Sequence, residues 1–310
     1  MGGGGGRSSY TGQRAKTLAG LVRKEAERSA GQFEVELAGY LSNLLAVYND
    51  RDVALVSQRL DQAKQAIEDE LETTFDQLYG GSVAKHTYVD GLSDIDTLLV
   101  LNDPKLQGAR PARILEEITE ILRERLPPGA TVDHGQMAVS VSYDDGMSIQ
   151  LLPALRTEKG LKVPSAKQGG WSDIDPEGFR SALTKVNNDC GGKLVPTIKL
   201  AKAVIANMPE QYRLTGYHAE SLAIAAFRDY KGPKTTETML PVFFERAKEL
   251  VLAPIRDRTG QSVHVDEYLG VENGEARRNV SHLLGNIAKR MLNASAGKSK
   301  GQWEAVFFNE

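Results

Sequence analysis

Cysteine is almost absent from this 310-residue chain, and histidine is scarce: there is one cysteine, Cys190, and there are five histidines. A single cysteine excludes an intramolecular disulfide and a metal site built from several thiolates, and it fits a reducing compartment. Cys190 stands in Asn-Asn-Asp-Cys-Gly-Gly with no histidine nearby in sequence. This setting favours a structural cysteine over a catalytic thiol.

Long apolar runs and a large excess of charge are also missing. No stretch approaches the roughly 18 apolar residues that cross a bilayer, and no signal-peptide pattern is present. The net charge of −3 gives no global attraction to nucleic acid. We therefore expect a cytoplasmic protein without a membrane partner. The length, with 41% hydrophobic and 25% charged residues, suits two globular domains.

The first part of the chain is predicted to be helical. Residues 1–12 include five successive glycines and are expected to form a disordered tail. Helical periods dominate from residue 13 to about residue 50, where a break is expected. A second amphipathic helix is predicted to end at Gly80 and Gly81, since glycine accepts positive φ there. Its apolar stripe comprises Leu60, Ala63, Ile67, Leu71, Phe75 and Leu78.

The stretch from Gly80 to Leu101 carries the chemistry. Ser82 and the N–H groups of the Gly-Gly-Ser turn can hold a phosphate, although a helix C-cap followed by an N-cap also explains this turn. Asp94 and Asp96 stand two residues apart as an apolar strand begins, so we expect both carboxylates on one face. Two carboxylates beside a phosphate-binding turn suit Mg²⁺ on a nucleoside triphosphate.

A small α+β unit is predicted around this stretch. The patterns indicate a helix over residues 111–126, strands near residue 132 and over 137–143, and a hairpin turn at Asp144-Asp145-Gly146. The return strand is expected to run from Met147 to Leu152 and to end at Pro153. Together these elements predict a mixed sheet with helices, in a domain spanning residues 13–170.

From residue 171 to residue 310 we expect an all-helical domain. Helical periods cover residues 194–205, 218–227, 236–252 and 276–292. Residues 294–301 look like a polar linker. The apolar residues Trp303, Val306, Phe307 and Phe308 are predicted to dock back onto this domain.

Several motifs resemble a known family. Gly81-Ser82 followed by Asp94-Ile95-Asp96 resembles the signature of the DNA-polymerase-β-like nucleotidyltransferase superfamily. The narrower resemblance is to the bacterial cGAS/DncV-like nucleotidyltransferases (CD-NTases), the signalling enzymes of anti-phage CBASS systems. It rests on four features: Gly91-Leu-Ser-Asp-Ile-Asp96, Leu151-Leu-Pro-Ala154, the helix carrying Lys199, and Leu214-Thr-Gly-Tyr-His218.

The resemblance implies a nucleotidyltransferase core with a helical C-terminal lid and an active site between them. Asp94 and Asp96 would bind Mg²⁺ or Mn²⁺, and ATP, often with a second nucleoside triphosphate, would be joined into a cyclic di- or trinucleotide. An activating HORMA-like protein, or another infection signal, would be the partner. The residues implied in nucleotide binding are Gly81, Ser82, Lys199, Lys202 and Tyr217. From the residues alone, the lysines also fit a solvated helix face, and the tyrosine also fits a core edge.

Gln150 departs from the family pattern, which typically has a third metal-binding carboxylate at this position. Strand parity places Gln150 on the polar side, opposite Ile149 and Leu151. Its amide oxygen can bind Mg²⁺ but carries no charge and is a poor base. Three explanations stay open: the glutamine is natural to this lineage and assisted by a water or a nearby acid; the site has lost activity by degeneration or engineering; or Asp144 or Asp145 supplies the carboxylate.

Two other functions also stay open: an RNA-tailing or protein-AMPylating transferase of the same superfamily, and a catalytically weakened nucleotide-binding protein. DNA as an activating ligand would use basic residues of the helix over 111–126. These residues are Arg110, Arg113, Arg123 and Arg125. Interleaved glutamates favour an ordinary solvated helix instead.

Overall fold

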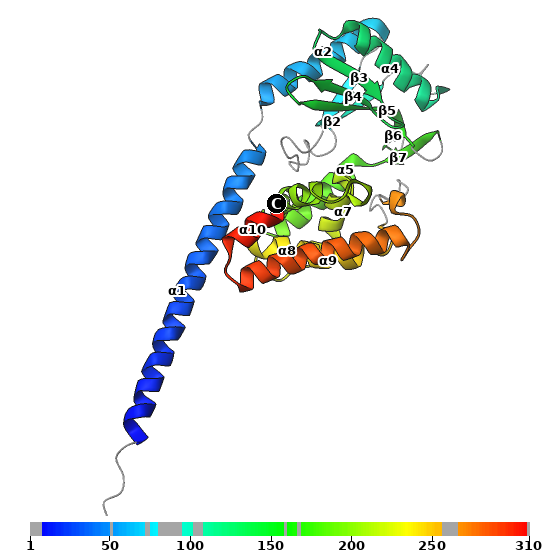
Figure 1. Ribbon diagram of the computed structural model, residues 1–310. Helices are drawn as coiled ribbons and strands as arrows, with labels where there is room; N and C mark the ends of the chain where they lie inside the picture. Colours follow the sequence, from blue (N-terminus) through cyan, green and yellow to red (C-terminus); the bar gives the residue numbers. More distant parts are fainter. Residues whose placement is uncertain are drawn as a thin grey trace, which may run out of the picture.

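The computed structural model describes residues 8–49, 52–71, 75–79, 95–101, 108–157, 160–165, 169–255 and 266–308. In Figure 1 these residues form a sheet unit and a helical unit, with the chain passing from strand β7 (Trp171–Ile174) into helix α5 (Pro176–Asp189). Each unit has its own large hydrophobic cluster. No described helix is both long enough and apolar enough to cross a membrane.

Two helices, α1 (Ser8–Asn49) and α2 (Val53–Leu71), open the fold and are separated at the predicted break. Helix α1 begins inside the stretch expected to be a disordered tail. Its residues Leu37 and Leu41 are buried in the core of the helical unit, while its N-terminal part extends away from both units (Figure 1). Helix α2 instead packs on the sheet, because its buried residues recur every three or four positions. These are Val56, Leu60, Ala63 and Ile67.

The predicted continuation of the second helix to Leu78 is wrong. Helix α2 ends at Leu71, and Phe75–Tyr79 form strand β1, which pairs antiparallel with β2 (Ile95–Leu101). The register runs from Phe75 opposite Leu101 to Tyr79 opposite Thr97. Phe75 and Leu78 continue the helical spacing of α2 in the sequence. Local spacing determines the structure of so short a segment less strongly than backbone pairing with a neighbouring strand does. The predicted glycine cap at residues 80–81 and the cap at Ser82 lie outside the described residues.

The described strands form one mixed sheet, which confirms the expected α+β class. Its order is β1-β2-β5-β4-β3, with β6 pairing β5 and β7. Strands β2 and β5 run parallel, and the other pairs are antiparallel. The bounds are β3 (Ala130–His134), β4 (Val139–Tyr143), β5 (Ser148–Thr157) and β6 (Gly160–Pro164). Strands β6 and β7 were not predicted, and β7 lies beyond the expected boundary at residue 170.

The prediction that Pro153 ends its strand is also wrong, because β5 continues to Thr157. One edge of β5 pairs with β2 from Ile149 to Leu155. On the other edge, β4 pairs only as far as Leu151, and β6 begins at Leu155. Pro153 lies between these two partners, so its missing N–H interrupts neither of their ladders.

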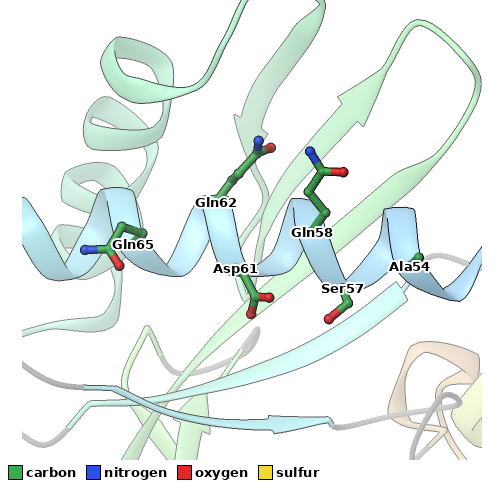
Figure 2. A pocket seen from close by; sticks show the side chains of 6 residues that line it. All are labelled: Ala54, Ser57, Gln58, Asp61, Gln62 and Gln65. Carbon is green, nitrogen blue, oxygen red and sulfur yellow. The ribbon is translucent and has the colours of Figure 1, made fainter.

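One face of the sheet is covered by two helices. Helix α2 and helix α4 (Pro111–Arg125) cover one face, on the side away from the helical unit (Figure 1). Ile149, Leu151 and Val141 are buried beneath them. The inward residues predicted for α4 are buried as expected: Ile114, Ile118, Ile121 and Leu122. The outer side of α2 is polar, and Figure 2 shows its Gln58, Asp61, Gln62 and Gln65 side chains.

The described part of the helical unit contains the four predicted helices, together with α5 and the C-terminal helix α10 (Lys300–Phe307), neither of which was predicted as a helix. The four are α6 (Leu194–Ala206), α7 (Gly216–Phe227), α8 (Thr236–Leu250) and α9 (Glu275–Ala296). Cys190 is free and buried in this core, and burial raises the pKa of its thiol, in keeping with the structural role expected. The expected docking of the C-terminal segment is confirmed for Trp303, Val306 and Phe307, which lie in α10 and are buried.

We predict that Trp303→Ala destabilises the helical unit by about 3–5 kcal/mol, since a large buried ring is replaced by a cavity. Trp303 is fully buried, and its indole N–H also donates to Ser295 Oγ at 3.1 Å. Urea unfolding of the full chain measures the change. Phe308→Ala is the matched control, because Phe308 is 55% exposed and its removal should change stability little. Equal effects of both substitutions would contradict the docking role of Trp303.

Candidate active site

The strand that carries Asp96 and the strand that carries Gln150 are direct neighbours. In the parallel β2–β5 pair, Asp96 is in register with Gln150, and Ile95 is in register with Ile149. Ile149 and Leu151 are buried under the helices, whereas Gln150 is half-buried on the opposite face. The strand parity predicted for Gln150 is therefore confirmed. The glutamine lies in register with one of the two candidate metal-binding aspartates.

The same register continues across the sheet. Gln150 pairs with Ser140 on β4, and Ser140 pairs with Asp133 on β3. Adjacent strands are separated by roughly 4.8 Å, which places Asp133 about 10 Å from Gln150, too far to share a metal ion with it. Asp133 instead lies 3.7 Å from the Arg123 guanidinium. The half-buried neighbour of Gln150 on this side is a neutral hydroxyl.

The hairpin aspartate Asp145 is engaged elsewhere. Its carboxylate accepts hydrogen bonds from the Arg59 guanidinium at 3.0 Å and from the Met147 N–H at 3.1 Å. The hydrogen bond from Arg59 is the main reason why the pKa of Asp145 is lowered. Arg59 belongs to α2, which packs on the covered face of the sheet. These contacts support a turn-forming role for Asp145 and do not support it as the third metal ligand.

Three predicted site residues lie outside the described residues: Gly81, Ser82 and Asp94. Within the described part of the chain, no group of three histidine, cysteine, aspartate or glutamate side chains is arranged to hold a metal ion.

The predicted lysines lie on α6 and have partners within the protein. The Lys202 ammonium is 2.8 Å from Glu220 Oε1 of α7, and these side chains are only 7% and 1% exposed. A buried ion pair of this kind compensates two charges that would be costly alone. Lys199 donates to the side chain of Asn49 at the end of α1. A Cβ added at Gly216 would lie 3.3 Å from Lys202 Nζ, so glycine keeps the start of α7 close to this lysine.

Tyr217 lies in the first turn of α7 and is 38% exposed. Thr215 caps the helix, since its hydroxyl accepts the His218 N–H at 3.2 Å. The Tyr217 ring packs on Phe179 of α5, with 4.6 Å between ring centroids and an angle of 39° between planes. Because part of Tyr217 stays exposed, its position fits both a core edge and a stacking platform.

Sequence reasoning missed Glu220 and Phe179. A signal for the first was present: Glu220 is the one acidic residue in the mainly apolar sequence of α7, and a charge on a buried helix needs a partner. The sequence does not show whether Lys199 or Lys202 of α6 is that partner. No comparable signal marks Phe179, because an aromatic residue at helical spacing is usual in any core.

His218 is fully buried beside Asp266 and Arg277, and its pKa is lowered to about 4, chiefly by burial. The nearby Asp266 raises this pKa, but burial outweighs it. At neutral pH, the His218 Nε2 and Asp266 Oδ2 atoms, 3.9 Å apart, are therefore not an ion pair.

We predict that the helical unit loses stability as the pH falls from about 6.5 toward about 4. A folded-state pKa below the ordinary 6.5 means that the unfolded chain binds the proton more tightly. The loss contributed by His218 is about 3 kcal/mol at most. His218→Gln should flatten the pH dependence in urea unfolding over this range, whereas His282→Gln, at an exposed site on α9, should not. An unchanged slope in the first variant would contradict the assignment.

Comparisons with known proteins agree with this geometry. Residues 36–187 match the model of the Second Messenger Oligonucleotide or Dinucleotide Synthetase (SMODS) domain. No curated protein matches the sequence.

Solved structures are similar over most of the chain. CdnG from Bradyrhizobium diazoefficiens in complex with GTP has a TM-score of 0.69 at 14% identity, covering 88% of this chain and 96% of that one. The DncV cyclic AMP-GMP synthase from Vibrio cholerae, in complex with the linear intermediate 5' pppA(3',5')pG, has a TM-score of 0.64 at 10% identity, with coverages of 97% and 91%.

A third structure, the STING-associated CdnE c-di-GMP synthase from Capnocytophaga granulosa, has a TM-score of 0.54 at 14% identity, with coverages of 81% and 85%. At these identities the structures establish the fold. The chain therefore carries a Second Messenger Oligonucleotide or Dinucleotide Synthetase domain over residues 36–187, which is a nucleotidyltransferase domain, on the fold that it shares with the DncV, CdnG and CdnE enzymes.

Proposed function

We propose that the protein uses a divalent metal to join ATP, with or without a second nucleoside triphosphate, into a cyclic di- or trinucleotide. The observation that carries this proposal is the β2–β5 register, which sets Asp96 beside Gln150 on the domain that matches the SMODS model. The similar DncV structure contains a linear pppA(3',5')pG intermediate, and the similar CdnG structure contains GTP. Both molecules fit a reaction that links nucleotides stepwise.

The donor set suits Mg²⁺ or Mn²⁺. Asp94 and Asp96 would supply carboxylate oxygens, and Gln150 would supply an amide oxygen. Hard divalent cations prefer such oxygen ligands. When bound, the metal ion would neutralise triphosphate charge and help to align the acceptor hydroxyl with the α-phosphorus.

The other residues would bind and orient the nucleotide. Gly81 and Ser82 would hold the β- and γ-phosphates through N–H and hydroxyl groups. Lys199 is the better candidate for a phosphate contact from the helical unit, because Lys202 is buried against Glu220. Lys202 would then fix α7 to α6. Tyr217, exposed on one side and packed on Phe179 on the other, would stack on a base.

Gln150 would act differently from a carboxylate. An amide is too weak a base to accept the proton of the attacking hydroxyl, so a water or a nearby carboxylate must take it. The amide N–H groups can instead donate to a phosphate or ribose oxygen. In this proposal the glutamine is natural to the lineage.

Two alternative functions make different predictions. An RNA-tailing or AMPylating enzyme would attach nucleotides to a macromolecule, and a weakened protein would bind the nucleotide without releasing pyrophosphate. Mass spectrometry of the products from all four nucleoside triphosphates, with Mg²⁺ or Mn²⁺, distinguishes the proposed function from these two alternatives. A small cyclic product would support the proposal.

We place this activity in anti-phage signalling in the cytoplasm, with a HORMA-like protein as a candidate activator. DNA is a weaker candidate. Of the arginines considered for DNA binding, Arg123 lies near Asp133 and donates to the Val132 carbonyl, and Arg125 pairs with Glu70. These contacts support the interpretation of α4 as an ordinary solvated helix.

We predict that Asp94→Asn combined with Asp96→Asn abolishes product formation, since neutral amides hold the metal ion far more weakly. Pyrophosphate release from ATP with Mg²⁺ measures the effect. Asp61→Asn on the outer side of α2 is the control and should keep full activity. Retained turnover in the double variant would disprove the assignment of the aspartates.

Gln150→Asp tests the origin of the glutamine. If the enzyme is adapted to glutamine, Gln150→Asp should lower its activity. The added carboxylate would repel the triphosphate, and the substitution would remove the amide N–H donors. Turnover of the same nucleotides gives the answer. A large gain would show instead that the site had been damaged.

A further inference from the structure

A cluster in the helical unit, built from three buried side chains and one half-exposed tyrosine, reaches the segment that carries Tyr217. The cluster comprises Arg277, Asp266, Tyr268 and His218, and we call it the Arg277 cluster. Arg277 and His218 belong to α9 and α7, whereas Asp266 and Tyr268 lie at the short 3₁₀ turn Glu267–Leu269. The cluster thus joins α7 to a turn and a helix that come later in the chain.

Arg277 anchors the turn. Its side chain is fully buried, and its guanidinium lies 2.6 Å from Asp266 Oδ2, in a pair that is itself completely shielded from solvent. The guanidinium also donates to backbone carbonyls on both sides of residues 256–265. These carbonyls belong to Val251, Ala253, Asp266 and Gly270. A planar donor group with this many fixed acceptors holds its surroundings rigidly.

Tyr268 transmits this anchoring to α7. Its hydroxyl oxygen accepts the Thr215 N–H at 3.2 Å and lies 2.7 Å from His218 Nδ1. Neutral His218 has one ring hydrogen, which we assign to Nε2, the atom nearer Asp266. Nδ1 then accepts the Tyr268 hydroxyl hydrogen. One hydroxyl therefore contacts the residues two before and one after Tyr217.

We propose that Tyr268 is a positioning residue for nucleotide binding: through its hydroxyl, the Arg277 cluster fixes the first turn of α7 and so the placement of Tyr217. Phe179 holds the Tyr217 ring from one side, and Tyr268 holds the backbone from the other. This inference rests on the proposed role of Tyr217 as a base-stacking residue. It adds that the stacking surface is arranged before the nucleotide arrives.

The test compares the binding of Mg-ATP with that of inorganic tripolyphosphate, which has no base, to the full-length chain. Tyr268→Phe should weaken ATP binding about 5-fold, the typical effect of one net hydrogen bond, and leave tripolyphosphate binding unchanged. Tyr230→Phe is the matched control, because it removes a hydroxyl that donates to the Pro233 carbonyl at the far end of α7. It should change neither affinity.

Tyr217→Ala separates the failure of the inference from the failure of the proposed function. If Tyr217→Ala weakens ATP selectively and Tyr268→Phe behaves like Tyr230→Phe, the positioning role is wrong and the stacking role stands. If Tyr217→Ala shows no selectivity for ATP, the stacking role fails and the inference fails with it. Equal weakening of both ligands by Tyr268→Phe would indicate general loosening and overturn the inference. His218→Leu, which removes the partner of the Tyr268 hydroxyl, should reproduce the selective loss if Tyr268→Phe does not fold.

Discussion

The parallel pairing of β2 with β5 is the constraint on which the rest of the structure depends. It joins the hairpin of β4 and β5 to the strand that carries Asp96, and β1 and β6 extend the sheet from it. Its register is fixed by burial, because Ile149 and Leu151 must lie under α2 and α4. A slip of one residue would bury Gln150 and expose both apolar neighbours. The packing that stabilises the core therefore also sets the candidate site.

Strong periodic patterns in the sequence predicted most of the helices and the central hairpin. The errors occurred where local pattern and three-dimensional pairing disagree. Phe75 and Leu78 extend the spacing of α2, yet their backbone pairs with β2. Pro153 marks a strand end in most settings, but here it lies between two edge partners of β5. Strands β6 and β7 are short, and short strands leave little periodicity to detect.

In the candidate site, too, some features could be predicted from the sequence and others could not. The motif residues were identified from the sequence, and the parity of Gln150 followed from simple alternation along a strand. The partners of the lysines could not be predicted in the same way, because Lys202 and Glu220 meet only after α6 and α7 pack. The Arg277 cluster is less visible still, since its members come from three separate segments. Charges within apolar runs indicated that partners exist, but not which residues they are.

Glutamine at position 150 is similar in size to a carboxylate residue but differs from it in charge and in hydrogen bonding. A carboxylate there would only accept hydrogen bonds and would add a second negative charge beside Asp96, whereas an amide both accepts and donates. The positions in register with Asp96 on the next two strands are thus the neutral Gln150 and Ser140. A neutral donor can approach phosphate or ribose oxygens without repulsion. Under the proposed function, Gln150 would therefore orient the nucleotide and would not act as a base, and a water or another carboxylate would accept the proton of the attacking hydroxyl.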